Sequence, residues 1–205
     1  MIAVIDYGAG NLQSVVKAFQ YLGVETSVTA DPAELRRADA AVLPGVGAFG
    51  DAMCCLQKSG LVNPVFDFID SGKPFLGICL GLQLLFESSE EAPGIHGLGV
   101  LEGTILKIPA ETGLKIPHVG WNSLNIRKPD GLFEGLNSNP YAYFVHSYYL
   151  KAEKAEIVSA TVDYGVRIDA AVQRENLFAT QFHPEKSGKA GLQMLKNFTQ
   201  QILEE

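Results

Sequence analysis

Cysteine is scarce in this chain of 205 residues, which contains only Cys54, Cys55 and Cys79. An odd number of cysteines, two of them adjacent, does not make a disulfide framework, and their spacing does not fit a metal site. Free thiols are typical of a reducing compartment. We therefore expect a cytoplasmic protein without a bound metal.

Runs of basic residues and long apolar stretches are also missing. The 16 Lys and Arg against 23 Asp and Glu give a formal net charge of −7, which argues against nucleic-acid binding. The longest apolar stretch, 75–86, includes Gln83 and two glycines and is much shorter than the roughly 20 residues of a membrane span. Asp6 interrupts the apolar N-terminus, so we expect neither a signal peptide nor a membrane anchor.

The first half of the chain does contain short apolar runs that alternate with helical periodicity. After a strand at 2–6, the apolar residues at positions 12, 15, 16, 19 and 22 form one stripe of a helix at 12–22. The same pattern predicts further strands at 24–29, 40–43 and 74–78, a turn at Asp31-Pro32, and helices near 48–58, 61–71 and 80–86. Strands and helices alternating at these lengths indicate βαβ units and a parallel sheet covered on both faces.

The second half has the pattern of an antiparallel or mixed extension of the same sheet. Short strand candidates occur at 100–107, 116–126, 142–150, 156–161, 166–173 and 177–182. Ser187 is placed to cap a C-terminal amphipathic helix, and no low-complexity linker divides the chain. We therefore predict a single α/β domain over 1–205, with three layers: an open, mostly parallel sheet flanked by helices and continued by antiparallel strands.

The segment Gly77–Gly81 has the spacing of a nucleophile elbow, with cysteine where many hydrolases have serine. Such a turn needs small residues on both sides of the nucleophile. It places the sulfur of Cys79 at a helix N-terminus, which favours the thiolate, and it aims the amide N–H of Leu80 at a developing oxyanion. The alternative is a buried cysteine in a glycine-rich turn.

A thiol nucleophile needs a base, and His183 follows a predicted strand. Glu185, two residues further on, is placed to orient the imidazole and so completes the logic of a Cys–His–Glu triad. Alone, His-Pro-Glu is typical of a surface turn, whereas together with the elbow it favours catalysis. His146 lies in a strand interrupted by polar groups, and we interpret it as a hydrogen-bonded core histidine.

Three motifs together resemble the class I (triad) glutamine amidotransferases: P-G-V-G-A-F at 44–49, G-I-C-L-G-L-Q at 77–83 and Q-F-H-P-E-K-S at 181–187. D-Y-G-A-G-N at 6–11, G-W-N at 120–122 and F-V-H-S-Y at 144–148 are similar to one branch of that family, the glutaminase subunits of imidazole glycerol phosphate synthase. The resemblance covers essentially the whole chain. It implies a flavodoxin-like core, glutamine as the substrate, and no cofactor.

The resemblance also implies roles for individual residues. Cys79 is the nucleophile, His183 the general base and then the acid, and Glu185 the residue that orients it. Substrate contacts come from the side chain of Gln83 and from main-chain groups of Gly45, Gly47, Ser147 and Tyr148. The N–H of Leu80 and one from Val46 or Gly47 form the oxyanion hole, the latter after a peptide flip.

A partner is implied as well. Glutaminases of this branch form a heterodimer with a cyclase subunit, a (βα)8 barrel, and pass ammonia through it. The candidate interface residues are Asn11, Trp121, Asn122 and Lys186. Trp121 is the only tryptophan, and an exposed one suits an interface, although a core anchor for a hairpin at 116–126 is the alternative.

Other functions stay open on the sequence alone. The same chemistry fits the glutaminase of pyridoxal phosphate synthase or of another amidotransferase. A thiol hydrolase or redox protein of flavodoxin-like architecture is a different class, in which neither Gln83 nor the His-Pro-Glu segment is expected. A non-catalytic binding module on this fold is disfavoured by the intact set of Cys79, His183 and Glu185.

Overall fold

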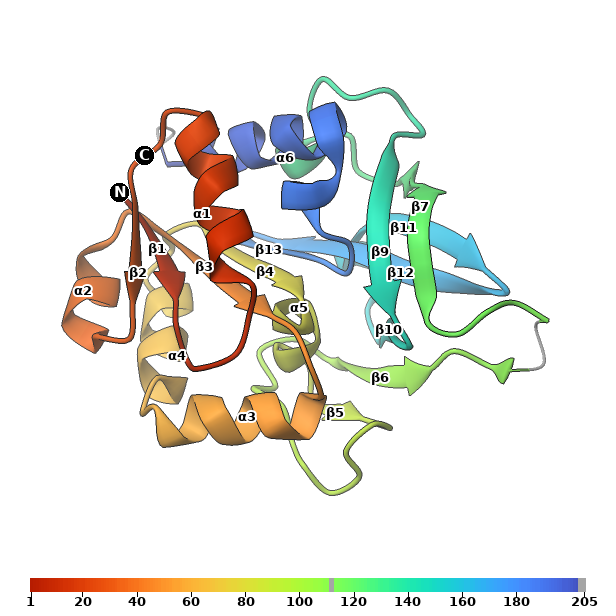
Figure 1. The fold of residues 1–205 in the computed structure, drawn as a ribbon, viewed down its shortest axis with the longest axis horizontal. Helices are drawn as coiled ribbons and strands as arrows, with labels where there is room; N and C mark the ends of the chain where they lie inside the picture. The colour runs from red at the N-terminus through yellow and green to blue at the C-terminus, as the bar shows by residue number, and fades with distance from the viewer. Residues whose placement is uncertain (111–112, 203–205) are drawn as a thin grey trace.

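The computed structural model describes residues 1–110 and 113–202. Its centre is an eight-stranded sheet in the order β2-β1-β3-β4-β13-β12-β11-β8 (Figure 1). The parallel strands are β1 (Ile2–Ile5), β2 (Thr26–Thr29), β3 (Ala40–Gly45), β4 (Phe75–Cys79) and β13 (Leu177–Thr180). The sheet continues with the antiparallel strands β12 (Val166–Arg174), β11 (Val158–Tyr164) and β8 (Asn125–Ile126).

Helices cover both faces of this sheet, which confirms the predicted three-layer α/β fold (Figure 1). On one face lie α1 (Leu12–Tyr21) and α6 (Gly188–Gln200), and on the other α3 (Phe49–Lys58), α4 (Val62–Asp70) and α5 (Leu80–Leu84). Successive side chains of a strand point to opposite faces. Ile2 and Val4 of β1 accordingly belong to the core under α1 and α6, and Ala3 and Ile5 to the core under α3 and α4.

Two smaller sheets lie beside the large one. One contains β10 (Tyr148–Ala152), β6 (Gly103–Lys107) and β5 (Ser88–Ser89), and the other is an antiparallel ribbon of β7 (His118–Ser123) and β9 (Tyr141–His146). The expected strand at 116–126 therefore splits into β7 and β8, and the strand at 142–150 splits at Ser147 into β9 and β10. Placing all these strands in one sheet was wrong.

One helix was missed, and the predicted cap residue of another helix makes no capping hydrogen bond. The Asp31-Pro32 turn is the start of α2 (Pro32–Arg37), because the Asp31 carboxylate accepts the N–H of Ala33 at 2.8 Å. Ser187 does precede α6, but its hydroxyl makes no capping bond there. Short 3-10 turns occur at Gly131–Phe133, Ala155–Ile157 and Pro184–Lys186. Within the described residues, no helix is long and apolar enough to cross a membrane.

Candidate active site

The predicted nucleophile and base lie at the same edge of the central sheet. β4 ends at Cys79, which is paired with Gly45 at the end of β3, and β13 ends one residue after Ala179, which is paired with Gly77. Because these strands are parallel, their carboxyl ends meet at one edge, where open α/β sheets bind ligands. His183 follows β13 by three residues, so the fold brings it to Cys79.

Cys79 is held in a backbone conformation that side chains rarely adopt. Its φ is +56° and its ψ −108°, and α5 begins at the next residue. A Cβ atom on Gly81 would lie 1.8 Å from the carbonyl oxygen of Leu43, and one on Gly77 would lie 2.9 Å from the carbonyl oxygen of Gly81. The prediction that the elbow needs small flanking residues is confirmed, and its cause is the close approach of α5 to β3 at Gly81 and to β4 at Gly77.

Glu185 holds the imidazole of His183 through Nδ1. The Nδ1 and Oε1 atoms are 2.8 Å apart, and the two side chains are only 3% and 1% exposed. The backbone N–H of His183 donates to the carbonyl of Tyr143, and the Ser187 hydroxyl donates to the carbonyl of His183. Ser187 therefore fixes the turn that carries the histidine, which explains why its hydroxyl does not cap α6.

The charge state of His183 follows from its neighbours. Burial alone would lower its pKa, but the Cys79 sulfur and the Glu185 carboxylate outweigh burial and raise the pKa to about 9. Among the described residues, Nε2 of His183 has no aligned hydrogen-bond partner. The sulfur is thus close enough to stabilise the imidazolium without a well-directed bond, as is common for catalytic pairs without substrate.

Replacing Glu185 by glutamine is expected to lower the pKa of His183 by at least about one unit, because the imidazolium loses an adjacent negative charge. In an NMR titration, the native imidazole should lose its proton near pH 9, and the variant should do so at clearly lower pH. Glu134→Gln, which removes an exposed carboxylate, is the control and should leave the midpoint unchanged. An unshifted midpoint in the Glu185 variant would show that the carboxylate does not stabilise the imidazolium.

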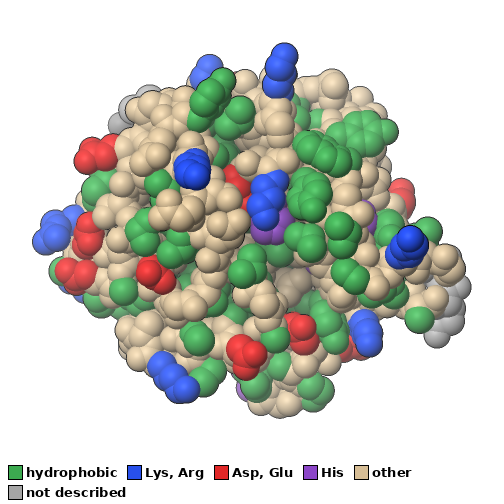
Figure 2. Space-filling model, viewed as in Figure 1, with side chains coloured by type: hydrophobic (Ala, Val, Ile, Leu, Met, Phe, Trp, Pro, Cys, Tyr) green, Lys and Arg blue, Asp and Glu red, His purple; other side chains and the backbone are tan. Residues whose placement is uncertain are grey.

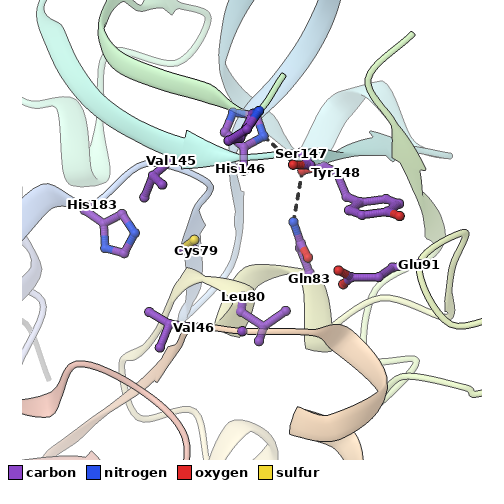
Figure 3. A pocket seen from close by; sticks show the side chains of 12 residues that line it. Val46, Cys79, Leu80, Gln83, Glu91, Val145, His146, Ser147, Tyr148 and His183 are labelled. Carbon is purple, nitrogen blue, oxygen red and sulfur yellow. Dashed lines mark hydrogen bonds between the residues drawn. The ribbon is translucent and has the colours of Figure 1, made fainter. Parts of the chain in front are cut away.

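A cavity of about 350 Å³ opens beside the sulfur. It is lined by Val46, Gly47, Cys79, Leu80, Gln83, Glu91, Pro117, Val145, His146, Ser147, Tyr148 and His183. Figure 3 shows the Cys79 sulfur and the His183 ring facing this space. Gly45 was expected to contact substrate but does not line the cavity: a Cβ there would lie 2.7 Å from the Tyr7 hydroxyl and 2.9 Å from Cβ of Leu80, so Gly45 allows close packing beneath the elbow.

Gln83 is positioned as the resemblance implied, one helical turn beyond Cys79 on α5. Its Nε2 donates to the carbonyl of Tyr148 at 3.1 Å and to Oε1 of Gln181 at 3.0 Å. The side chain is buried and fixed at the cavity wall (Figure 3). The bonds to Tyr148 and Gln181 leave the Gln83 carbonyl oxygen as the group available to a ligand.

Two polar residues of the site were not assigned a role from the sequence. Gln181 is fully buried, and its Nε2 lies 3.8 Å from the Cys79 sulfur. Glu91 lies on the opposite side of Gln83 from His183, and its carboxylate accepts the N–H of Phe49 at 2.8 Å (Figure 3). Gln181 directly precedes the Phe-His-Pro-Glu segment, so its position was a usable signal. Glu91 belongs to none of the motifs and reaches the site from the turn after β5.

The four candidate interface residues lie outside the cavity. Asn11 is exposed at the start of α1, and Lys186 is half-buried in the turn after His183. Trp121 is 54% exposed, which rules out the alternative that it anchors a core hairpin. Asn122 faces inward on β7, where its amide donates to the carbonyl of Asp163. Within the described residues, no group of His, Cys, Asp or Glu side chains is arranged to hold a metal ion.

Comparison with known proteins agrees with this geometry. The family model of class-I glutamine amidotransferases matches residues 3–202. Imidazole glycerol phosphate synthase subunit HisH of Syntrophotalea carbinolica is 53% identical over 203 residues, covering 97% of this chain and 98% of the relative. The subunit of the same name from Methanothermobacter thermautotrophicus is 52% identical, covering 98% of this chain and 99% of the relative.

Solved structures share the fold at low identity. PurLQS from Thermotoga maritima superimposes with a TM-score of 0.76 at 20% identity, covering 97% of both chains. A crystal structure of a glutamine amidotransferase gives a TM-score of 0.76 at 18% identity, covering 98% of this chain and 99% of that one. With the family model spanning nearly all of the sequence, the chain belongs to the class I glutamine amidotransferase family.

Proposed function

We propose that this chain is the glutaminase subunit of an imidazole glycerol phosphate synthase. It hydrolyses glutamine to glutamate and ammonia and passes the ammonia to a cyclase subunit. The observation that carries the proposal is the buried His183–Glu185 pair beside the sulfur of Cys79, at the wall of a cavity. The names of the relatives, about 50% identical along nearly the whole chain, support the choice of synthase.

The chemistry follows from the positions of the three groups. His183 takes the proton of the Cys79 thiol, and the sulfur attacks the side-chain amide carbon of glutamine. The N–H of Leu80 stabilises the oxyanion. His183 then gives its proton to the departing ammonia, and a water molecule activated by the same imidazole cleaves the thioester to release glutamate. The raised pKa of His183 suits both roles, because the imidazole accepts the thiol proton readily and keeps it until ammonia leaves.

The polar groups at the far end of the cavity suit the amino-acid end of glutamine. The carbonyl oxygen of Gln83 and the carboxylate of Glu91 can accept hydrogen bonds from the α-ammonium group. The resemblance adds main-chain contacts at Gly47, Ser147 and Tyr148, which all line the cavity. Glutamine bound in this way has its side-chain amide directed at Cys79.

The outer face of the β7–β9 ribbon is the proposed docking surface for the cyclase. Val119 and Trp121 on β7 and Tyr141 and Val145 on β9 are 56%, 54%, 60% and 38% exposed. Figure 2 shows hydrophobic side chains gathered over this part of the molecule, next to a basic side chain and a histidine. An exposed aromatic amid apolar neighbours is typical of an interface.

The cyclase subunit, a (βα)8 barrel, would use the ammonia to form imidazole glycerol phosphate and aminoimidazole carboxamide ribonucleotide in histidine biosynthesis. The ring-forming lyase step belongs to that partner, and the two subunits would work as a heterodimer. A cytoplasmic location is part of the proposal, because Cys79 must remain reduced.

Adding the ribonucleotide-loaded cyclase is expected to raise glutamine hydrolysis at least about 100-fold, the effect of one oxyanion donor. The donor would come from the loop after β3, where Gly47 has a φ of +99° and, as a glycine, allows the preceding peptide to flip. Turnover is measured with and without the cyclase. Trp121→Ala should weaken activation, whereas Tyr21→Ala, which removes an exposed aromatic from α1, should not. Equal turnover with and without the cyclase would contradict the proposal.

A further inference from the structure

Two histidines are buried side by side, one of them, His146, in the cavity wall, and the proposed chemistry uses neither. His118 on β7 and His146 on β9 are 2% and 6% exposed and form a pair across the ribbon. Nδ1 of His118 lies 3.0 Å from Nε2 of His146, and Nδ1 of His146 lies 2.9 Å from the carbonyl oxygen of Tyr148. The ring of His118 is stacked between Phe144 and Tyr164, which fixes its plane.

Each hydrogen bond made by His118 and His146 has only one possible direction. A carbonyl can only accept, so Nδ1 of His146 carries the hydrogen that points to Tyr148. Burial lowers the pKa of both histidines to about 4, so each ring is neutral at pH 7 and has one N–H. Nε2 of His146 therefore accepts from Nδ1 of His118, and Nε2 of His118 accepts from the Asn122 amide, 3.4 Å away.

The Tyr148 carbonyl also fixes the orientation of the side-chain amides of Gln83 and Gln181. Because the Tyr148 oxygen accepts from Gln83, the atom of Gln83 that faces it is the NH₂ group. The second hydrogen of that group goes to Gln181, whose facing atom must be the oxygen. Gln181 consequently presents its own NH₂ group to the sulfur of Cys79. One continuous chain of hydrogen bonds runs from Asn122 to the nucleophile.

We propose that His118 and His146 are positioning residues for glutamine hydrolysis, which hold the Tyr148 carbonyl where it orients the amides of Gln83 and Gln181. The inference rests on the proposed glutaminase function, since it deepens the role of the same site. Through this chain, Gln83 turns its carbonyl oxygen to the substrate. Gln181 turns an N–H toward the sulfur, where a donor stabilises the thiolate.

Nitrogen-15 NMR of the unaltered protein tests the chain without any mutation. At pH 7 both His118 and His146 are expected as neutral rings with hydrogen on Nδ1 and a bare Nε2. An Nε2–H tautomer in either ring would overturn the proposal, because a lone pair of His146 would then face the Tyr148 oxygen or the two rings would no longer be joined. This result does not depend on whether the protein hydrolyses glutamine, so it separates the inference from the proposed function.

Two substitutions at His146 test the consequence for substrate. His146→Leu removes the bond to Tyr148, and His146→Asn places an amide N–H close to the position of Nδ1–H. The measurement is alkylation of Cys79 by iodoacetamide, followed by mass spectrometry, and its suppression by glutamine. The leucine variant is expected to need about tenfold more glutamine for half-protection, because Gln83 loses a fixed partner, while the asparagine variant stays within about threefold of the wild type.

Equal loss of protection in both variants would show a merely structural role and overturn the proposal, as would unchanged protection in the leucine variant. Should the leucine variant fail to fold, the asparagine variant and the NMR result still test whether the hydrogen-bond chain positions Gln83. Failure of glutamine to protect even the wild-type Cys79 would count against the proposed function and not against the hydrogen-bond chain.

Discussion

Replacing Cys79 by alanine is expected to lower glutamine hydrolysis by at least about 10⁴-fold while the fold survives. Removing the nucleophile of a triad removes the covalent route, and only binding and the oxyanion donor remain. Stability should change by less than about 1 kcal/mol, because cysteine and alanine both carry a Cβ atom and experience the same positive φ. Turnover is measured with the cyclase partner present, and stability by chemical denaturation.

Cys54→Ala is the matched control for this experiment, since Cys54 is an exposed cysteine on α3 outside the cavity. It should retain full turnover. Hydrolysis that persists at the wild-type rate in the Cys79 variant would remove the basis of the proposed function, because no other described cysteine lines the cavity.

Gly81→Ala is expected to have the largest effect on stability, a loss of at least about 3 kcal/mol in the free energy of unfolding. The added Cβ would lie 1.8 Å from the carbonyl oxygen of Leu43. Because this contact is with the backbone of β3, it can be relieved only by moving α5 or β3 as a whole. Alanine favours a helix over glycine by about 1 kcal/mol, so the loss would occur against an intrinsic gain. Denaturant unfolding followed by circular dichroism measures it.

The control is Gly50→Ala on α3, which makes the same chemical change in a helix. Its Cβ would meet only Cδ1 of Ile95 at 3.0 Å and Cβ of Ala92 at 3.2 Å, and the Ile95 side chain is 40% exposed and free to move. We expect a change within about 1 kcal/mol. A Gly81 variant as stable as the Gly50 variant would show that α5 can move away from β3 without cost.

The sequence predicted the elbow and the His183–Glu185 pair because each is local. Gly77, Cys79 and Gly81 occupy one short turn, and Glu185 reaches His183 from two residues away, so spacing along the chain determines spacing in the fold. The approach of His183 to Cys79 is not local and depends on the parallel pairing of β4 and β13. Gln181 and Glu91 show the limit of this approach. Their contacts with the sulfur and with α3 come from strand and loop packing that residue spacing does not describe.

The first half of the fold was predicted well because each βαβ unit has its own periodicity. The helix α2 was missed although Asp31, Pro32 and Glu34 are typical helix-start residues, because six residues are too few to show a stripe. In the second half, strands change sheet at Leu124 and Ser147 without a glycine or proline at the break. Such breaks depend on which sheet each segment can pair with, and periodicity alone does not reveal them.

The backbone at Cys79 has an evolutionary implication. At a φ of +56° the backbone favours glycine, so at Cys79 this chain carries a residue that its own fold disfavours. Cys79→Gly would remove the backbone strain at the elbow and so raise the free energy of unfolding, but it would also remove the nucleophile and with it glutamine hydrolysis. Selection for stability alone would erase this sulfur, and its presence records selection for reactivity.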